Sequence, residues 1–162
     1  MMLIKNLLKI VLLSFILFAF IMHSESFADT DLELSSGNTL YVSVYSNIYS
    51  APKAIRLELA TMLSLRNTDP KNSITILKAD YYDTAGKLID SYLKKPLVLK
   101  PLESSYIYLK EYDKRGGPGA NFIVKWQADK KVNQPIIETI MFSTRHGISF
   151  VCPGQIIKEN IE

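Results

Sequence analysis

The chain has 162 residues, 22% of them charged, and a formal net charge of +3 at pH 7. Apart from the pairs Lys94-Lys95 and Lys130-Lys131 the charges are scattered, which argues against a nucleic-acid interface because such an interface needs a basic stripe. The single cysteine, Cys152, excludes an intrachain disulfide, so the fold must be stabilised by its apolar core.

The first 28 residues have the pattern of a secretory signal peptide. Lys5 and Lys9 give a positive start, residues 10–22 form an apolar run, and Ser26-Phe27-Ala28 offers the small residues of a cleavage site. The run is shorter than the roughly 20 residues of a membrane-spanning helix. We therefore expect cleavage near Ala28 and export to the periplasm or the medium, with an uncleaved N-terminal membrane anchor as the alternative. No cysteine lies directly after the run, which excludes lipid attachment there.

The rest of the chain, residues 29–162, has the length of one domain. Removing two lysines and one glutamate with the signal peptide leaves 17 basic and 15 acidic residues, a net charge of +2. We expect a flexible lead-in at 29–38, one folded domain at 39–153 and a C-terminal tail at 154–162. No transmembrane segment is expected in the mature chain.

Apolar and polar side chains alternate along most of this chain, which is the period of a β-strand. Residues 55–66 are the clearest case: five aliphatic side chains from Ile55 to Leu65 share one face, and Arg56, Glu58 and Arg66 share the other. The same period predicts strands at 41–46, 73–82, 87–93, 105–112, 121–128 and 136–143, with a short edge strand at 148–152. Phe122, Val124 and Trp126 are predicted core residues.

Turn sequences separate the predicted strands. They are Asn-Thr-Asp-Pro at 67–70, Asp-Thr-Ala-Gly at 83–86, Lys-Pro-Leu at 100–102, Gly-Gly-Pro-Gly at 116–119 and Asn-Gln-Pro at 133–135. About seven or eight short strands at this spacing, with no amphipathic helix between them, predict an all-β fold and a single antiparallel β-sandwich.

The segment LRNTDPKNSITILKADYYDTAGKLIDSYLKKPLVLKPLES, with GGPGANFIVKWQADKKVNQPIIETIM, HGISF and YVSVYSNIYS, resembles the bacterial domain-of-unknown-function 3124 family over about residues 39–153. The resemblance implies a small exported bacterial protein with no assigned activity and no catalytic residues. The rhythm of the segment is more loosely similar to immunoglobulin-like accessory domains of bacterial surface proteins. We therefore expect an immunoglobulin-like sandwich, a likeness that says nothing about function.

An acidic stretch lies between residues 67 and 86. Asp80, Asp83 and Gly86 do not have the spacing of a calcium-binding EF-hand loop. Asp83 and Gly86 instead suit a tight turn, because aspartate can accept a hydrogen bond from its own backbone two residues on and glycine tolerates positive φ. Asn67 and Asp69 are interpreted as a turn in the same way, and no metal site is predicted.

The glycine-rich loop at 116–121 is the most unusual stretch. Glycine loops can present backbone N–H groups to an anion, but a phosphate-binding loop needs Gly-Lys-Ser/Thr at the start of a helix, and here Phe122 begins a strand. We interpret the loop as a sharp turn at one end of the sandwich, with a ligand loop as the alternative. The candidate residues for that alternative are Arg115, Gly116, Gly117, Gly119, Asn121, Arg145 and His146.

His146 is the only histidine outside the signal peptide, so a hydrolase triad or a thiol dyad with Cys152 would have to use it. The chain has no G-x-S-x-G nucleophile elbow, and two such ligands are too few for a structural zinc. We interpret His146 as a polar loop residue and Cys152 as a small buried or half-buried hydrophobic residue.

Tyrosines are abundant, nine against one tryptophan. Two groups share strand parity, Tyr41 with Tyr45 and Tyr49, and Tyr106 with Tyr108 and Tyr112. Such a stripe usually covers one sheet face with each hydroxyl in water, although it could also bind a glycan or a partner chain.

These features together predict an exported protein without catalytic activity or cofactor, which binds an unknown protein or envelope partner and no nucleic acid. The alternatives are a ligand- or metal-binding protein that uses the loops around Gly116–Asn121 and Arg145-His146, and a hydrolase or thiol enzyme that uses His146.

Overall fold

The computed structural model describes residues 33–158, and the predicted signal peptide lies outside them. The described chain forms twelve strands in antiparallel sheets and no helix, which confirms the all-β prediction. The strands are β1 (Ser35–Val44), β2 (Asn47–Ser50), β3 (Ile55–Glu58), β4 (Ala60–Arg66), β5 (Ile74–Tyr82), β6 (Leu88–Ser91), β7 (Leu97–Leu99), β8 (Ser104–Leu109), β9 (Ala120–Val132), β10 (Ile136–Ser143), β11 (Ile148–Pro153) and β12 (Gln155–Ile157).

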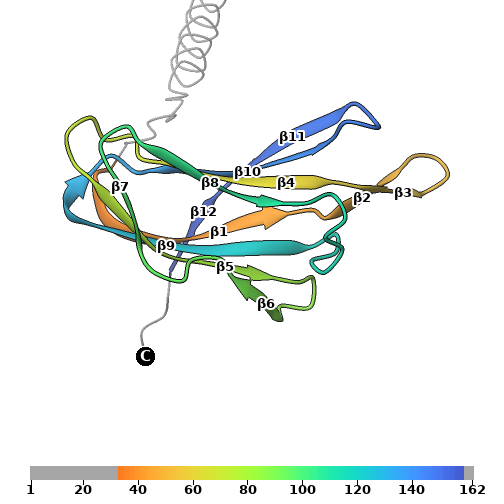
Figure 1. Cartoon of the computed structure of the whole chain (residues 1–162), viewed down its shortest axis with the longest axis horizontal. Coiled ribbons are helices and arrows are strands. Elements are labelled where there is room, and N and C mark those ends of the chain that lie inside the picture. Colours follow the sequence, from red (N-terminus) through yellow and green to blue (C-terminus); the bar gives the residue numbers. More distant parts are fainter. Residues whose placement is uncertain (1–32, 159–162) are drawn as a thin grey trace, which may run out of the picture. The chain divides into compact units, whose positions relative to one another are not determined.

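Two sheets lie face to face (Figure 1). The six-stranded sheet has the order β12-β1-β9-β5-β6, with β7 also paired to β5, and the four-stranded sheet has the order β11-β10-β4-β8. β2 and β3 form a separate two-stranded hairpin that projects from one end (Figure 1). The order of the four-stranded sheet makes β8 and β11 its edge strands.

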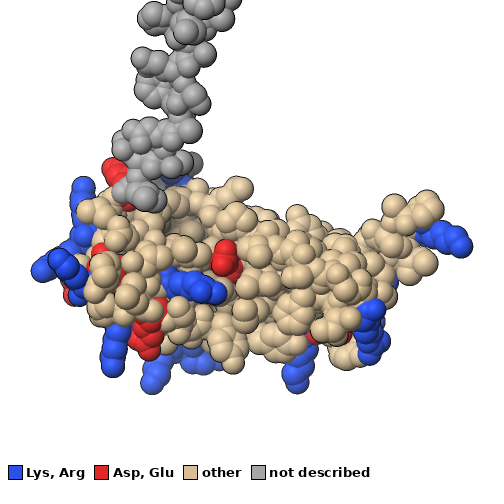
Figure 2. Space-filling model, turned by 90° about the horizontal axis from the view of Figure 1, so that it is seen from above, with Lys and Arg blue, Asp and Glu red and all other residues tan. Residues whose placement is uncertain are grey.

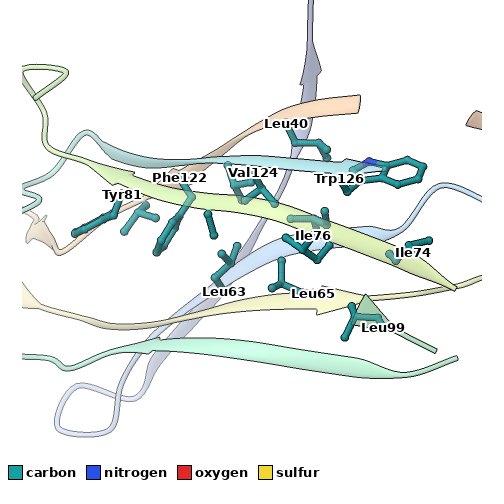
Figure 3. Packing of buried hydrophobic residues seen from close by; sticks show 14 of the residues in the cluster. Leu40, Leu63, Leu65, Ile74, Ile76, Tyr81, Leu99, Phe122, Val124 and Trp126 are labelled. Atoms are coloured by element: carbon teal, nitrogen blue, oxygen red, sulfur yellow. The ribbon is translucent and has the colours of Figure 1, made fainter. Parts of the chain in front are cut away.

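The core lies between the two sheets (Figure 3). Leu63 and Leu65 of β4 point into it from one side, and the predicted core residues Phe122, Val124 and Trp126 of β9 point into it from the other. All five are at most 1% exposed, which confirms the predicted faces of both strands. Burial of such a side chain contributes about 1.5–3 kcal/mol of transfer free energy.

The chain changes sheets at Gly154, between β11 and β12. The Gly154 N–H donates to the carbonyl of Ile137 over 2.8 Å, and a Cβ at this position would lie 2.7 Å from the same oxygen. Only glycine permits this close approach of two backbones. The turn lets the last strands join the edges of both sheets on one side of the molecule.

Several predicted boundaries were wrong. There are twelve strands and not seven or eight, because β2, β7 and β12 are short and lie between or beyond the segments with clear alternation. Residues 55–66 form β3 and β4, and the break falls where the Leu59 N–H donates to the carbonyl of Ser46. β1 begins at Ser35 within the predicted lead-in, and β12 lies within the predicted tail.

The turn after β4 is organised by a buried carboxylate, Asp69. Its Oδ1 accepts from the backbone N–H groups of Lys71 (2.9 Å) and Asn72 (2.8 Å), and its Oδ2 accepts from the N–H of Asn133 (3.2 Å). These bonds, that of Lys71 first, hold the pKa of Asp69 below its ordinary value of 3.8 although burial raises it. The charged form is therefore the one that the turn stabilises.

This network predicts a specific acid sensitivity. Because the folded-state pKa of Asp69 is depressed, its stabilising contribution is complete above the unfolded value and is lost as the pH falls through the folded value. We expect the urea midpoint of the native protein to fall between about pH 5 and pH 2, and to fall less in Asp69→Asn. That variant should already be less stable at pH 7, because an amide nitrogen cannot accept from Asn133. Equal acid dependence in the two proteins would contradict this role of Asp69.

Candidate functional site

The outer face of the four-stranded sheet carries an unusual set of side chains. The register places Tyr108 of β8 opposite Met62 of β4, Met62 opposite Ile140 of β10, and Ile140 opposite Val151 of β11. Tyr106 and Phe142 extend this row on either side, and all of these side chains point away from the core. We call the surface formed by Tyr106, Tyr108, Met62, Ile140, Phe142 and Val151 the tyrosine face.

The tyrosine face is open to solvent. Tyr106 is 66% exposed and Tyr108 is 49% exposed, and the Tyr108 ring stacks on Phe142 with centroids 6.4 Å apart. Figure 2 looks onto this sheet and shows a broad surface with few charged side chains, while most basic groups stand at its rim. Contiguous exposed apolar surface of this kind marks interaction sites in soluble domains.

A pocket of about 360 Å³ adjoins the tyrosine face at the end of β8. It is lined by Tyr92, Tyr108, Leu109, Lys110, Tyr112 and Asp113. Tyr92 follows β6 of the other sheet, so the pocket lies across the open side between the two sheets. The loop at 110–119 forms its far wall.

The glycine-rich loop, interpreted from the sequence as a sharp turn with a ligand role as the alternative, is bound to neighbouring segments by hydrogen bonds. The carbonyl of Gly116 accepts from the backbone N–H and the hydroxyl of Thr84, and the carbonyl of Gly117 accepts from the N–H of Ser46. The Gly119 N–H donates to the Thr84 hydroxyl over 3.0 Å. These contacts tie the loop to the β1–β2 connection and to the turn after β5.

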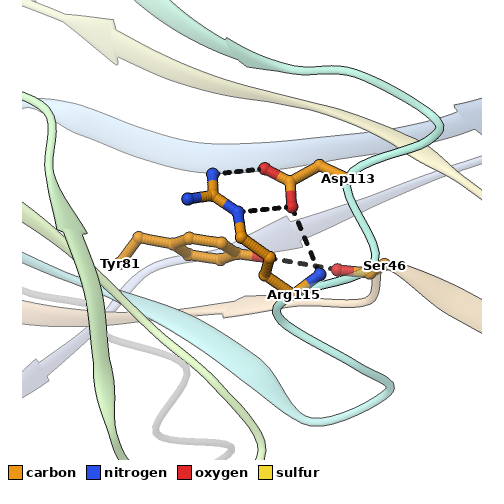
Figure 4. Close-up of polar contacts among 4 residues, drawn as sticks. All are labelled: Ser46, Tyr81, Asp113 and Arg115. Carbon is orange, nitrogen blue, oxygen red and sulfur yellow. Dashed lines mark hydrogen bonds and ion pairs between the residues drawn. The ribbon is translucent and has the colours of Figure 1, made fainter.

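Arg115 is also engaged within the loop (Figure 4). Its guanidinium donates to both carboxylate oxygens of Asp113, over 2.9 and 2.7 Å. This pairing lowers the pKa of Asp113 and keeps it ionised. Beneath it, burial raises the pKa of Tyr81, whose hydroxyl bonds with Ser46 over 3.1 Å. The paired charges of Arg115 and Asp113 therefore cancel each other at the edge of the pocket.

The remaining candidate residues do not converge with the glycines. Asn121 is buried in β9, opposite Tyr82 and Ser43. Arg145 and His146 are exposed in the β10–β11 turn, and Arg145 donates to the hydroxyl of Tyr112 with its guanidinium 5.7 Å from that ring's centroid. The structure thus joins Arg145 to the pocket wall but does not assemble the seven predicted residues into one site.

His146 and Cys152 lie at opposite ends of the β10–β11 hairpin. Cys152 is opposite Thr139 and half-buried, while His146 is in the turn beyond Ile148. Four strand residues from Cys152 to Ile148 span about 13 Å. A thiol–imidazole dyad is therefore not formed by these two residues.

Cys152 is expected to react slowly with thiol reagents. Burial raises the pKa of its thiol above the ordinary value of 9.0, so the thiolate is scarcer at neutral pH than in an exposed cysteine. Alkylation by iodoacetamide at pH 7.5 should be slower in the folded protein than in urea. Faster reaction of the folded protein would contradict this and would revive the thiol-enzyme alternative.

The two tyrosine groups that share strand parity in the sequence are arranged differently in the structure. Tyr106 and Tyr108 share the outer face as predicted, but Tyr112 lies in the loop. Tyr45 packs on Phe150, with ring centroids 5.9 Å apart, and Tyr49 lies on the projecting hairpin, so the first group does not form a stripe.

The apolar residues beside Tyr106 and Tyr108 were missed by the sequence analysis. Residues 136–143, IIETIMFS, are apolar at both parities, with Ile140 and Phe142 on one face and Ile137 and Met141 on the other. This pattern lacks the regular alternation of a strand with one apolar and one polar face. This signal could have indicated that the four-stranded sheet presents apolar side chains on both faces.

Within residues 33–158, no group of three or more histidine, cysteine, aspartate or glutamate side chains is placed to hold a metal ion. The same residues contain no helix of the length and hydropathy that a membrane crossing requires.

Residues 37–157 match the family described as "Protein of unknown function (DUF3124)". No curated protein matches the chain. A crystal structure titled Thermotoga maritima 1070 is similar with a TM-score of 0.45 and 10% sequence identity, over 75% of this chain and 96% of that one.

Proposed function

Since the chain belongs to the DUF3124 family of proteins of unknown function, we propose a function from its surface: it is an exported, non-catalytic binding module of the cell envelope. The observation that carries the proposal is the tyrosine face. It presents large amphipathic rings and aliphatic side chains that a domain of this size would otherwise bury.

The composition of this face supports a protein partner. Aromatic residues and methionine are enriched in protein interfaces, and charged residues are depleted at their centres. Tyr106, Tyr108 and Met62 stand together, while Glu138 lies in the same cross-strand row as Tyr106, with Ser64 between them, and Arg66 lies one row beyond, so the charges are confined to the Tyr106 end of the face. The tyrosine rings lose little conformational freedom on binding because they have only two side-chain torsions.

We propose that the fold is an immunoglobulin-like sandwich. The pairs β4–β8 and β5–β9 correspond in chain order to the B–E and C–F pairs of that fold. The outer strands differ. In the immunoglobulin order β1 would pair with β4 and β10 with β9, whereas here β1 pairs with β9 and β10 pairs with β4.

Export rests on the N-terminal sequence, with its positive start, apolar run and Ser-Phe-Ala site. Edman sequencing of the protein recovered from the envelope or medium tests it. An N-terminus at Asp29 is expected, and recovery in the cytoplasmic fraction with Met1 retained would overturn export.

The tyrosine face is tested by the double variant Tyr106→Ser/Tyr108→Ser. Both rings are largely exposed but Tyr108 also stacks on Phe142, so the double variant should lower the free energy of unfolding by no more than about 2 kcal/mol and should stay folded. Capture of envelope proteins by the variant should lose any partner that the native protein retains specifically. Tyr49→Ser, at a tyrosine 57% exposed on the hairpin, is the matched control. A partner retained by the double variant but lost by the control would overturn the assignment of this face.

A further inference from the structure

We propose that the free edge of β8 receives an extended segment of a partner protein, which adds a strand to the four-stranded sheet and places an acidic side chain beside Lys110. This inference rests on the proposed function and makes it more specific. The tyrosine face is the general binding surface, and the β8 edge determines how the partner segment aligns and that this segment is an extended strand.

The edge itself is unprotected. Within residues 33–158 β8 pairs only with β4, so alternate residues from Ser104 to Leu109 direct their N–H and C=O groups away from the sheet. Natural proteins usually blunt such an edge with charges, proline or a bulge. The sequence SSYIYL has no charge and no proline, and its register with β4 is unbroken.

The other exposed edges are less suitable. β11 ends in Pro153, which cannot donate a backbone hydrogen bond. β6 has only four residues, and its pairing with β5 shifts register next to Tyr82. β12 has three residues. β8 and β11 are the longest of the edges considered, six residues each, and of these two strands only β8 is free of proline.

An added strand would also find contacts for its side chains. Along a strand, side chains alternate between the two faces. Those on the outer side would lie beside Tyr106 and Tyr108, and one on the other side would reach the pocket at the end of β8, whose wall includes Tyr92 and Tyr112. Backbone bonds and side-chain pockets together are the mode of β-strand addition.

The charges at the pocket select an acidic side chain. Asp113 is neutralised by Arg115, whereas Lys110 lines the pocket without an ion-pair partner among the described residues. Arg145, at the adjoining wall, contacts the Tyr112 ring and forms no ion pair within residues 33–158. Of the two charged residues that line the pocket, Asp113 is paired with Arg115 and Lys110 is left for an aspartate or glutamate of the partner to complement.

A second copy of the chain complements this edge less well. If two β8 strands pair antiparallel with their outer faces on the same side, each residue faces one of equal parity, since side chains alternate. Lys110 then lies opposite Ser104, or opposite Leu102 or Tyr106 in the neighbouring registers. None of these is acidic, so the charge of Lys110 would stay unmatched.

Synthetic peptides test the proposal on the exported protein. The probe is a peptide of about eight alternating valine and threonine residues with one glutamate near its N-terminus, a typical strand length. We expect it to perturb the backbone amide NMR signals of Ser104–Lys110 and to slow hydrogen exchange of alternate β8 amides. The same peptide N-methylated at alternate amides should bind at least about tenfold more weakly, because it cannot complete the strand pairing.

Lys110→Glu supplies the test of charge. The variant should favour the corresponding lysine peptide over the glutamate peptide, and Lys131→Glu, in β9, should leave the preference unchanged. Absence of binding at millimolar peptide, or equal binding of the N-methylated peptide, would overturn strand addition. A peptide-free dimer in sedimentation with protected β8 amides would overturn it in favour of a second copy.

These failures are distinguishable from failure of the proposed function. If peptides do not bind but Tyr106→Ser/Tyr108→Ser still loses the envelope partner, the binding role of the tyrosine face is supported and strand addition is wrong. If peptides protect the β8 amides from exchange while that variant keeps its partner, strand addition is supported and the assignment of the tyrosine face as the binding surface is wrong.

Discussion

Asn67→Ala is expected to lower the free energy of unfolding by about 3 kcal/mol, because several buried backbone groups lose their partner at once. The Asn67 Nδ2 donates to the carbonyls of Asn72 (2.9 Å), Leu99 (3.1 Å) and Lys100 (2.9 Å), and its Oδ1 accepts from the N–H of Asp69 over 3.0 Å. One side chain thus joins the turn after β4 to the end of β7.

Urea unfolding followed by tryptophan fluorescence measures this loss, since Trp126 is the only tryptophan and lies in the core. Asn38→Ala is the matched control, because among residues 33–158 its amide donates only to the Ser35 hydroxyl, and it should cost less than about 1 kcal/mol. Asn67→Asp, which keeps the acceptor but replaces the donor, should be at least as destabilising as Asn67→Ala. Equal stability of Asn67→Ala and Asn38→Ala would contradict the linking role of Asn67.

Gly116→Ala is expected to cost about 2–3 kcal/mol, because the new methyl group meets a packed wall. A Cβ at residue 116 would lie 1.9 Å from the Tyr81 hydroxyl and 2.7 Å from the Ala120 Cβ. Either Tyr81 must leave its hydrogen bond with Ser46 or the loop must move away from β5.

Gly119→Ala, in the same loop, separates this clash from a general effect of substituting glycine. Its Cβ would come no closer than 3.2 Å to Thr84, so its cost should be below about 1 kcal/mol. Removal of the nearest atom by Tyr81→Phe should make the cost of Gly116→Ala smaller in the double variant than in the single one. A strictly additive double-mutant cycle would show that the two residues do not meet.

The loop and the proposed binding edge are linked through these contacts. The glycine carbonyls bind Ser46 and Thr84, so the loop at 110–119 is held where Tyr112 forms a wall of the pocket beside β8. A loosened loop in Gly116→Ala should therefore weaken peptide binding as well as stability, whereas Gly119→Ala should preserve both.

Most strands could be predicted from the sequence because alternation is a property of neighbouring residues. Leu63 and Leu65 had to share a face in any extended backbone, and so did Phe122, Val124 and Trp126. The turn at Asp83 and Gly86 also followed from local chemistry: Asp83 Oδ1 accepts from the N–H groups of Ala85 and Lys87, and Gly86 has a φ of 77°.

The candidate site was harder to predict because its contacts join distant parts of the chain. Gly116 is required by Tyr81, 35 residues earlier, and no property of the loop sequence names that partner. Arg145 was paired in the prediction with the glycine loop but meets Tyr112, which the sequence analysis had assigned to a strand. The apolar outer face emerges only when β4, β8, β10 and β11 are aligned.

The sequence by itself determined the family, the all-β class, the faces of the longest strands and the turn chemistry between them, because each depends on the order of adjacent side chains and on backbone geometry. The tertiary structure alone decided which strands are edges, at which positions only glycine fits, and that Tyr108 lies in one cross-strand row with Met62, Ile140 and Val151. Those outcomes depend on the pairing and packing of segments far apart in sequence, and local periodicity carries no information about which segment a strand will pair with.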